Sequence, residues 1–133
     1  YGIKPDVGLV VEVTHATDSP GVEPNGIGRV EVGKGPVIAR GANMNPVLFD
    51  LIMRTAREED IAVQVIGVPR ATGTDANVMQ LSRGGVATAL IGIPLRYMHT
   101  PVEVLSLSDL ERTIELLTAV VERIRAEESF IPQ

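Results

Sequence analysis

A carboxylate and an imidazole each follow an apolar segment of this chain. Glu12 interrupts the apolar run 7–13, and His99 follows the more apolar run 86–93. A carboxylate inside such a run must reach water or be compensated by a metal ion, a cation or hydrogen-bond donors. Neutral imidazole is a common zinc ligand. Glu12 and His99 are therefore candidate metal ligands, although Glu12 on an edge strand could equally face solvent.

The segment 94–103 concentrates further polar side chains around His99. Arg96, Tyr97 and Glu103 lie there among small and apolar residues. A carboxylate beside a metal-bound histidine often accepts its second ring N–H and fixes the tautomer, so Glu103 is a candidate for that role. The alternative is a surface histidine beside a local Arg96–Glu103 ion pair of little energetic effect.

Two other segments place polar side chains where the chain turns. His15 and Asp18 follow the Glu12 segment, and Thr74 and Asp75 begin a short predicted helix. Asp18 precedes Ser-Pro-Gly and suits a turn, while Thr74 and Asp75 suit a helix N-terminus. Local structure can account for these residues, so a place in a site needs independent support.

The elements that must position these side chains are predicted by the hydrophobic pattern. The predicted strands lie at 7–13, 29–32, 36–40, 61–68 and 86–93. The predicted helices lie at 46–59, 75–82 and 109–127. Segments 18–26 and 94–103 are expected to be loops. This order predicts an α/β fold with a layered helix–sheet–helix arrangement and a mainly parallel or mixed sheet, in which ligands collect at the carboxyl ends of strands.

Two helices have clear start signals. Asn45 and Pro46 provide an N-cap followed by proline at the first helical position. Ser108 and Glu111 form a capping-box pattern ahead of the last helix. The expected buried stripe of that last helix consists of Leu110, Ile114, Leu117, Val121 and Ile124.

Composition limits the class of protein. The 133 residues are 44% apolar and 22% charged, which suits one soluble globular domain. A net charge of −5 with scattered basic residues argues against a nucleic-acid partner. The longest strongly apolar run, 86–95, is too short to span a membrane, and there is no cysteine. We therefore expect a cytoplasmic protein without membrane contact.

One apparent nucleotide-binding motif fails on inspection. Residues 28–34 match the first seven positions of a P-loop, but Gly35 replaces the serine or threonine that would hold magnesium, and Pro36 follows. A Gly-x-Ser-x-Gly elbow is also absent, which argues against a serine hydrolase.

Four segments, taken together in order and spacing, resemble one family of peptidases. They are VEVTHATDSPG (11–21), GKGPVI (33–38), ATGTDA (71–76) and IPLRYMHTPVE (93–103). Their residues resemble the tetrahedral aminopeptidases, also labelled glutamyl aminopeptidases or, misleadingly, endoglucanases. The resemblance implies a homo-oligomeric metallopeptidase that holds two divalent ions, zinc or cobalt, and removes residues from the amino end of peptides. The implied fold is half of a zinc-peptidase-like catalytic domain.

The resemblance also implies roles for individual residues. Glu12 stands where the family has an aspartate that binds one metal, and His99 stands at a ligand position of the second metal. Glu12 keeps the carboxylate but is one methylene longer, which changes its reach. The side chains expected beside these ligands or near the substrate are Asp18, Thr74, Asp75, Arg96, Tyr97 and Glu103.

The remaining parts of the family's metal centre are expected upstream of Tyr1. The resemblance places the first metal-binding histidine, the bridging aspartate and a Glu-Glu pair with the general base there, together with an inserted assembly domain. Residues 1–133, which open without methionine, would be the C-terminal part of the catalytic domain. A catalytic zinc needs three protein ligands, so we expect this chain to be inactive alone.

Two other functions are compatible with some of these features. The chain could be a non-catalytic assembly or peptide-binding module on the same fold. An endoglucanase has little support, since 3% aromatic residues provide few sugar platforms. Arg96 and Lys34 could favour an acidic amino-terminal residue in a substrate, or could serve structure alone.

Overall fold

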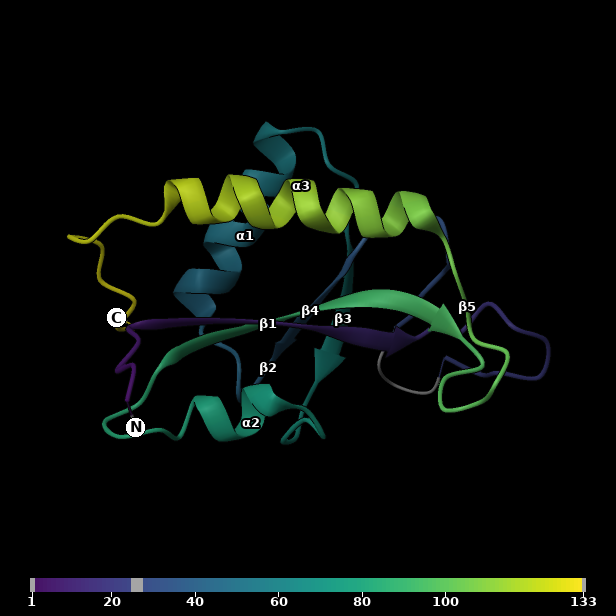
Figure 1. Ribbon diagram of the computed structural model, residues 1–133, viewed down its shortest axis with the longest axis horizontal. Helices are drawn as coiled ribbons and strands as arrows, with labels where there is room; N and C mark the ends of the chain where they lie inside the picture. Colours follow the sequence, from purple (N-terminus) through teal and green to yellow (C-terminus); the bar gives the residue numbers. More distant parts are fainter. Residues whose placement is uncertain (1, 25–27, 133) are drawn as a thin grey trace.

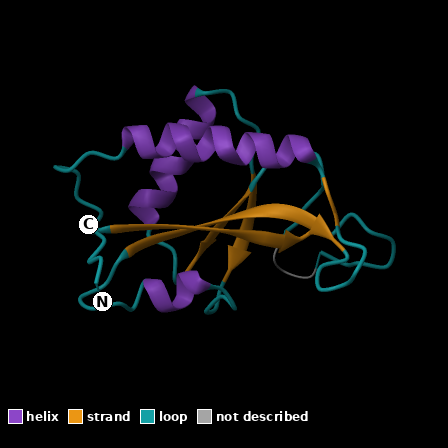
Figure 2. Ribbon diagram, viewed as in Figure 1, coloured by secondary structure: helices purple, strands orange, loops and turns teal. Residues whose placement is uncertain are grey.

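The computed structural model describes residues 2–24 and 28–132 and shows a sheet between two helical layers (Figure 1). The strands are β1 (Val7–His15), β2 (Val37–Gly41), β3 (Gln64–Val68), β4 (Ala87–Arg96) and β5 (Val104–Leu105). The helices are α1 (Pro46–Glu58), α2 (Asp75–Met79) and α3 (Leu107–Arg123). α1 and α3 cover one face of the sheet and α2 covers the other (Figure 2). The predicted layered α/β fold is confirmed.

The sheet is mixed and mostly parallel. Its order is β1-β4-β2-β3, with β5 on the end of β4. β1 runs parallel to β4, with Glu12 opposite Gly92 and His15 opposite Leu95, so the carboxyl ends of both strands lie at the same end of the sheet. A Cβ at Gly92 would overlap the Thr14 side chain. Glycine at position 92 thus permits the close approach of β1 and β4 near that end.

Two apolar cores, one on each face, hold the layers together. Alternate residues of a strand point to opposite faces, so the neighbours Leu90 and Ile91 of β4 enter different cores. The core under α2 includes Val10, Ala39, Ile66, Ala76 and Leu90. The core under α1 and α3 includes Ile38, Leu48, Ile52, Leu116 and Val120. The continuous apolar run of β4 therefore belongs to a strand covered on both faces, as predicted.

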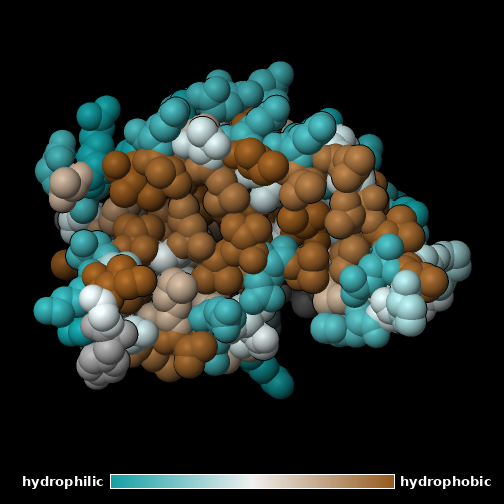
Figure 3. Space-filling model, in the orientation of Figure 1, coloured by the Kyte–Doolittle hydropathy of each residue, from teal (hydrophilic) through white to brown (hydrophobic). Residues whose placement is uncertain are grey.

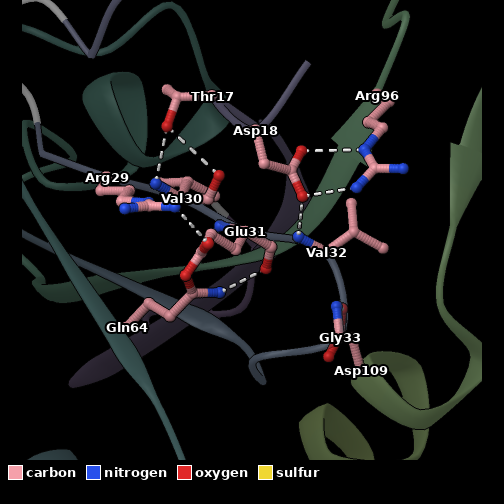
Figure 4. Close-up of polar contacts among 10 residues, drawn as sticks. All are labelled: Thr17, Asp18, Arg29, Val30, Glu31, Val32, Gly33, Gln64, Arg96 and Asp109. Carbon is pink, nitrogen blue, oxygen red and sulfur yellow. Dashed lines mark hydrogen bonds and ion pairs between the residues drawn. The ribbon is translucent and has the colours of Figure 1, made fainter. Parts of the chain in front are cut away.

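The predicted strand at 29–32 is wrong. This segment is irregular, and its backbone groups bond mainly to side chains instead of a neighbouring strand (Figure 4). Thr17 Oγ1 contacts both backbone groups of Val30, and the Gln64 amide bonds to both backbone groups of Glu31. When side chains bond the backbone of a segment in place of a neighbouring strand, the sequence of that segment has no periodic pattern that reveals it.

The predicted loops also need correction. Segment 94–103 is not all loop, because β4 continues to Arg96 before the chain leaves the sheet. Segment 18–24 is irregular, as expected, whereas residues 25 and 26 of that predicted loop lie outside the described residues. The ends of α2 and α3, at Met79 and Arg123, come earlier than predicted.

α3 buries a different face from the predicted one. Leu117 and Ile124 pack against the core, but Leu110, Ile114 and Val121 are exposed. The buried residues are Asp109, Thr113, Leu116 and Val120. Each of these residues lies one position before a residue of the predicted stripe. Because one residue corresponds to a rotation of about 100° in an α-helix, the helix is rotated from its expected orientation by roughly that angle.

Within the described residues, no helix is both long and apolar enough to cross a bilayer.

The orientation of α3 follows from Asp109. Its buried carboxylate accepts hydrogen bonds from the backbone N–H groups of Gly33, at 2.6 Å, and Gly35, at 2.8 Å. Gly35 has a φ of 90°, and a Cβ there would overlap the carbonyl of Ala62. A carboxylate in the first turn of a helix is also favoured by the helix dipole. Asp109 therefore fixes α3 to the turn at 33–35, and the predicted capping box, with Ser108 as N-cap, is replaced by a start at Ser106.

We expect Asp109→Asn to lower the free energy of unfolding by about 1–3 kcal/mol, because an amide cannot accept both backbone N–H bonds and leaves a buried donor unsatisfied. Urea denaturation followed by circular dichroism measures the change. Asp50→Asn, on the exposed side of α1, is the matched control and should have almost no effect. Equal stabilities of the two variants would contradict the role of Asp109.

Candidate metal centre

Glu12 lies near the carboxyl end of β1 on the face covered by α2. Its side chain is partly buried, and Oε1 accepts a long hydrogen bond of 3.4 Å from the backbone N–H of Asp75, the first residue of α2. Thr74 occupies the predicted N-cap position, but its hydroxyl bonds to Thr72 Oγ1 at 2.7 Å and caps nothing. The structure thus brings Glu12 beside Asp75, while Thr74 faces its own turn.

His99 lies in the loop that follows β4, in an uncommon backbone conformation. Tyr97 and His99 have φ values of 60° and 65°, which are unusual for residues other than glycine. Thr100 holds the loop through bonds from its N–H and hydroxyl to the Tyr97 carbonyl. Glu103 accepts the backbone N–H of His99 at 2.7 Å, whereas we expected it to accept the ring N–H. Glu103 therefore positions the His99 backbone and leaves the ring to other contacts.

His15 joins the end of β1 to the His99 loop. The ring centroids of His15 and His99 are 6.3 Å apart, with the rings inclined at 69°. The sequence offers His15 as a further potential ligand in a loop beyond the predicted strand, whereas His15 is the last residue of β1. Only the parallel pairing of β1 with β4, which places their carboxyl ends together, could have indicated that His15 lies near His99.

Asp18 and Arg96 form the strongest polar contact in this region (Figure 4). Arg96 donates from Nε to Oδ1 at 2.8 Å and from a terminal nitrogen to Oδ2 at 2.6 Å, and Val32 N–H adds a third bond to Oδ2. The expected Arg96–Glu103 ion pair is therefore wrong. This bidentate ion pair connects the segment after β1 to the last residue of β4, and so it positions the ends of both strands.

The ion pair shifts the pKa values of both Asp18 and Arg96. The hydrogen bonds from Arg96 lower the pKa of the Asp18 carboxyl, the Val32 N–H adds to this, and burial opposes it. The same contact raises the pKa of Arg96. Arg96 thus bonds to Asp18 through Nε and one terminal nitrogen of its guanidinium.

A hollow of about 480 Å³ lies beside His15 and the start of the loop that follows β4. Its lining residues are His15, Ala16, Thr17, Ser19, Pro20, Val22, Glu23, Tyr97 and Met98. A larger hollow of about 850 Å³ lies at the opposite end of β1 and β4, against Val7, Ala87 and the segment 124–132. The smaller hollow lies at the end of the sheet where β1 and β4 finish, but neither Glu12 nor His99 is among its lining residues.

The candidate ligands fit a metal centre in chemistry but not in number. Carboxylate oxygen and imidazole nitrogen both suit zinc and cobalt. Within residues 2–24 and 28–132, no hydrogen bond or ring contact joins Glu12 to His99, and no three His, Asp or Glu side chains lie close enough together to hold an ion. Two donors are fewer than the three protein ligands of a catalytic zinc. Any two-metal centre would therefore take most of its ligands from elsewhere.

Comparison with known proteins identifies the family to which this fold belongs. The sequence matches the M42 glutamyl aminopeptidase family over residues 1–116, and the chain belongs to that family. The lysyl aminopeptidase of Pyrococcus furiosus is 44% identical over 127 residues, covering 94% of this chain and 35% of that protein. The chain thus spans about a third of the length of this relative.

Solved structures agree with the family assignment. The TET aminopeptidase from the marine sediment archaeon Thaumarchaeota archaeon SCGC AB-539-E09 superposes with a TM-score of 0.84 at 34% identity, covering 92% of this chain and 34% of that one. The TET1 peptidase of Pyrococcus horikoshii, which can assemble into a tetrahedron or a large octahedral shell, gives a TM-score of 0.65 at 26% identity, with 85% and 32% covered. This chain covers about a third of each of these two peptidase chains.

Asp18 provides a pH test of the strand-end arrangement. Its folded-state pKa is depressed, so its stabilising effect is fully present above the ordinary value of 3.8 and is lost as the pH falls through the folded value. We expect carbon-detected NMR titration to give Asp18 a pKa below 3.8, and Arg96→Gln to raise it toward that value. An Asp18 pKa unaffected by Arg96→Gln would contradict the pairing.

Proposed function

We propose that this chain supplies one carboxylate, from Glu12, and one imidazole, from His99, to the two-metal centre of an M42 aminopeptidase. The observation that carries the proposal is the parallel β1–β4 pair, which ends both candidate segments at one end of the sheet. Family membership provides the chemical context. In this proposal residues 1–133 form the C-terminal part of the catalytic domain, and the other ligands and the general base come from the part of the enzyme that the chain does not span.

The two ions, zinc or cobalt, would when bound polarise the scissile carbonyl and lower the pKa of a water molecule. The role of this chain is to hold and orient donors. Glu12 presents a carboxylate with the extra reach of one methylene, and Asp75 N–H limits its movement. Glu103 fixes the His99 backbone, and the Asp18–Arg96 pair holds together the strand ends that carry both segments.

Peptides with a free amino terminus are the proposed substrates. The hollow beside His15 and Tyr97 is large enough to receive part of an amino-acid side chain, and its lining residue His15 is in ring contact with the candidate ligand His99. Arg96 is engaged by Asp18, and Lys34 lies on the turn anchored by Asp109. Neither residue is positioned in this hollow to select acidic substrates. We also propose that the enzyme forms a homo-oligomeric assembly, as TET1 of Pyrococcus horikoshii does, and that it is cytoplasmic.

A chimeric enzyme tests the two ligands. The third of Pyrococcus furiosus lysyl aminopeptidase that this chain matches would be replaced by residues 1–133, and hydrolysis of aminoacyl p-nitroanilides would be measured with zinc or cobalt. Because each variant removes a metal ligand, we expect Glu12→Gln and His99→Ala to reduce kcat/KM roughly 100-fold or more, with loss of bound metal by elemental analysis. Glu12→Asp should retain activity.

The controls separate loss of a ligand from loss of fold. Glu122→Gln changes an exposed carboxylate on α3 and should leave turnover and metal content unchanged. The 133-residue chain alone should show no turnover. Full activity and metal content in Glu12→Gln or His99→Ala, or turnover by the isolated chain, would contradict the proposal and favour a non-catalytic module.

A further inference from the structure

We propose that the hollow beside His15 is a specificity pocket for a cationic side chain, so that the preferred substrates are peptides with lysine or arginine at the amino terminus. The inference rests on the proposed function and adds a substrate class to it. Glu23 is the residue that attracts the charge, and Tyr97 provides the ring against which the charged side chain packs. We call the hollow, with the lining residues given above, the His15 pocket.

The His15 pocket lies beside the candidate metal centre. The segments that follow β1 and β4 form it, and both leave the sheet at the same end (Figure 1). His15 is part of the lining, and its ring centroid is 6.3 Å from that of the candidate ligand His99. The volume of about 480 Å³ is within the range of ligand pockets, roughly 300–1,000 Å³. A substrate held at His99 therefore has a space of suitable size next to it for a long side chain.

Glu23 gives the His15 pocket a negative charge. It is the one carboxylate among the described lining residues, which include neither lysine nor arginine. In the described part of the chain, its carboxylate forms no hydrogen bond and no ion pair. A carboxylate without a partner at the edge of a pocket is available to a cationic ligand.

The arginines of the neighbouring segments have carboxylate partners of their own. Arg96, at the end of β4, forms its bidentate pair with Asp18, and Arg29 pairs with Glu31 at 2.8 Å. Each of these pairs balances a positive charge with a negative one. The charge of Glu23 is therefore the one that the described lining of the pocket leaves unbalanced.

Tyr97 presents its ring at the pocket from a strained backbone. Its φ of 60° is a genuine outlier for a bulky residue. The N–H and hydroxyl of Thr100 hold this conformation by bonding to the Tyr97 carbonyl at 3.2 and 2.6 Å. Strain of this kind persists where the surrounding structure enforces it, and it clusters at ligand sites. The residue is 52% exposed, so its ring is accessible to a cation, which binds favourably over an aromatic face.

The rest of the lining suits the methylene groups of a lysine or arginine side chain. Its apolar members are Ala16, Pro20, Val22 and Met98. Long cationic side chains lay their methylene groups on apolar surface while the charge reaches a polar partner. Figure 3 shows apolar and hydrophilic side chains next to each other at the end of the molecule where β1 and β4 finish. An acidic side chain would instead meet the like charge of Glu23, and the pocket therefore favours a cation.

A comparison of substrates in the chimeric enzyme tests the assignment. Hydrolysis of lysyl, leucyl and glutamyl p-nitroanilides would be measured for the chimera and its variants, so that any preference due to the Pyrococcus furiosus part is the same in each protein. Because Glu23→Gln removes one partly exposed ion pair, we expect it to lower kcat/KM for the lysyl substrate roughly 5-fold and to leave the leucyl value unchanged. Glu23→Lys should lower the lysyl value further and raise the glutamyl value.

The control variants separate the charge and the ring from general effects on the enzyme. Tyr97→Phe keeps the ring and should keep the lysyl preference, whereas Tyr97→Leu should reduce it. Glu122→Gln removes an exposed carboxylate on α3 and should change no substrate ratio. Lysyl-to-leucyl ratios that are the same in the chimera, in Glu23→Gln and in Glu23→Lys would overturn the pocket assignment.

The pocket and the metal centre fail in different ways. Full turnover of all three substrates by Glu12→Gln or His99→Ala would refute the metal-centre proposal, whatever the substrate ratios are. If the chimera hydrolyses none of them, NMR titration of the isotope-labelled 133-residue chain decides the question. Lysine amide should shift the backbone signals of Glu23 and Tyr97, leucine amide should not, and Glu23→Gln should abolish the effect. No shift at these residues with lysine amide would overturn the pocket assignment.

Discussion

The parallel pairing of β1 with β4 is the constraint on which the candidate site depends. It sets Glu12 opposite Gly92 and brings the segments after both strands to one end of the sheet. The Asp18–Arg96 pair then joins those segments across 78 residues of sequence through two short charge-assisted bonds. With the glycine at position 92 permitting close contact to Thr14, the strand ends have little freedom to move apart.

A second carboxylate determines the orientation of the last helix. Asp109 accepts two backbone N–H groups from the 33–35 turn and thereby sets the rotation of α3. That rotation buries Thr113 and Leu116 and leaves Ile114 exposed. Asp109 thus both anchors α3 to the 33–35 turn and sets which apolar side chains of α3 are exposed.

Local sequence signals predicted the elements that depend on local chemistry. Asn45 accepts the Leu48 N–H and Pro46 begins α1, as the cap pattern indicated, and the apolar run of β4 predicted a doubly covered strand. Two failures, the strand predicted at 29–32 and the buried face of α3, share one cause, which is a hydrogen bond to a residue distant in sequence. Gln64 replaces a strand partner for segment 29–32, and the 33–35 turn decides which face α3 buries. In the candidate site, residue types indicated Glu12 and His99, but neither the Arg96–Asp18 pairing nor the proximity of His15 to His99 has a signal in a single sequence.

The central claim is that Glu12 and His99 belong to one metal centre completed by another part of an M42 enzyme. Anomalous diffraction from crystals of the assembled enzyme grown with zinc tests it most directly. The account predicts two zinc peaks, one at about 2.0–2.2 Å from a Glu12 carboxylate oxygen and the other at the same distance from a His99 ring nitrogen, roughly 3.5–4 Å apart. Zinc bound entirely by other residues, with Glu12 and His99 in separate environments, would contradict it.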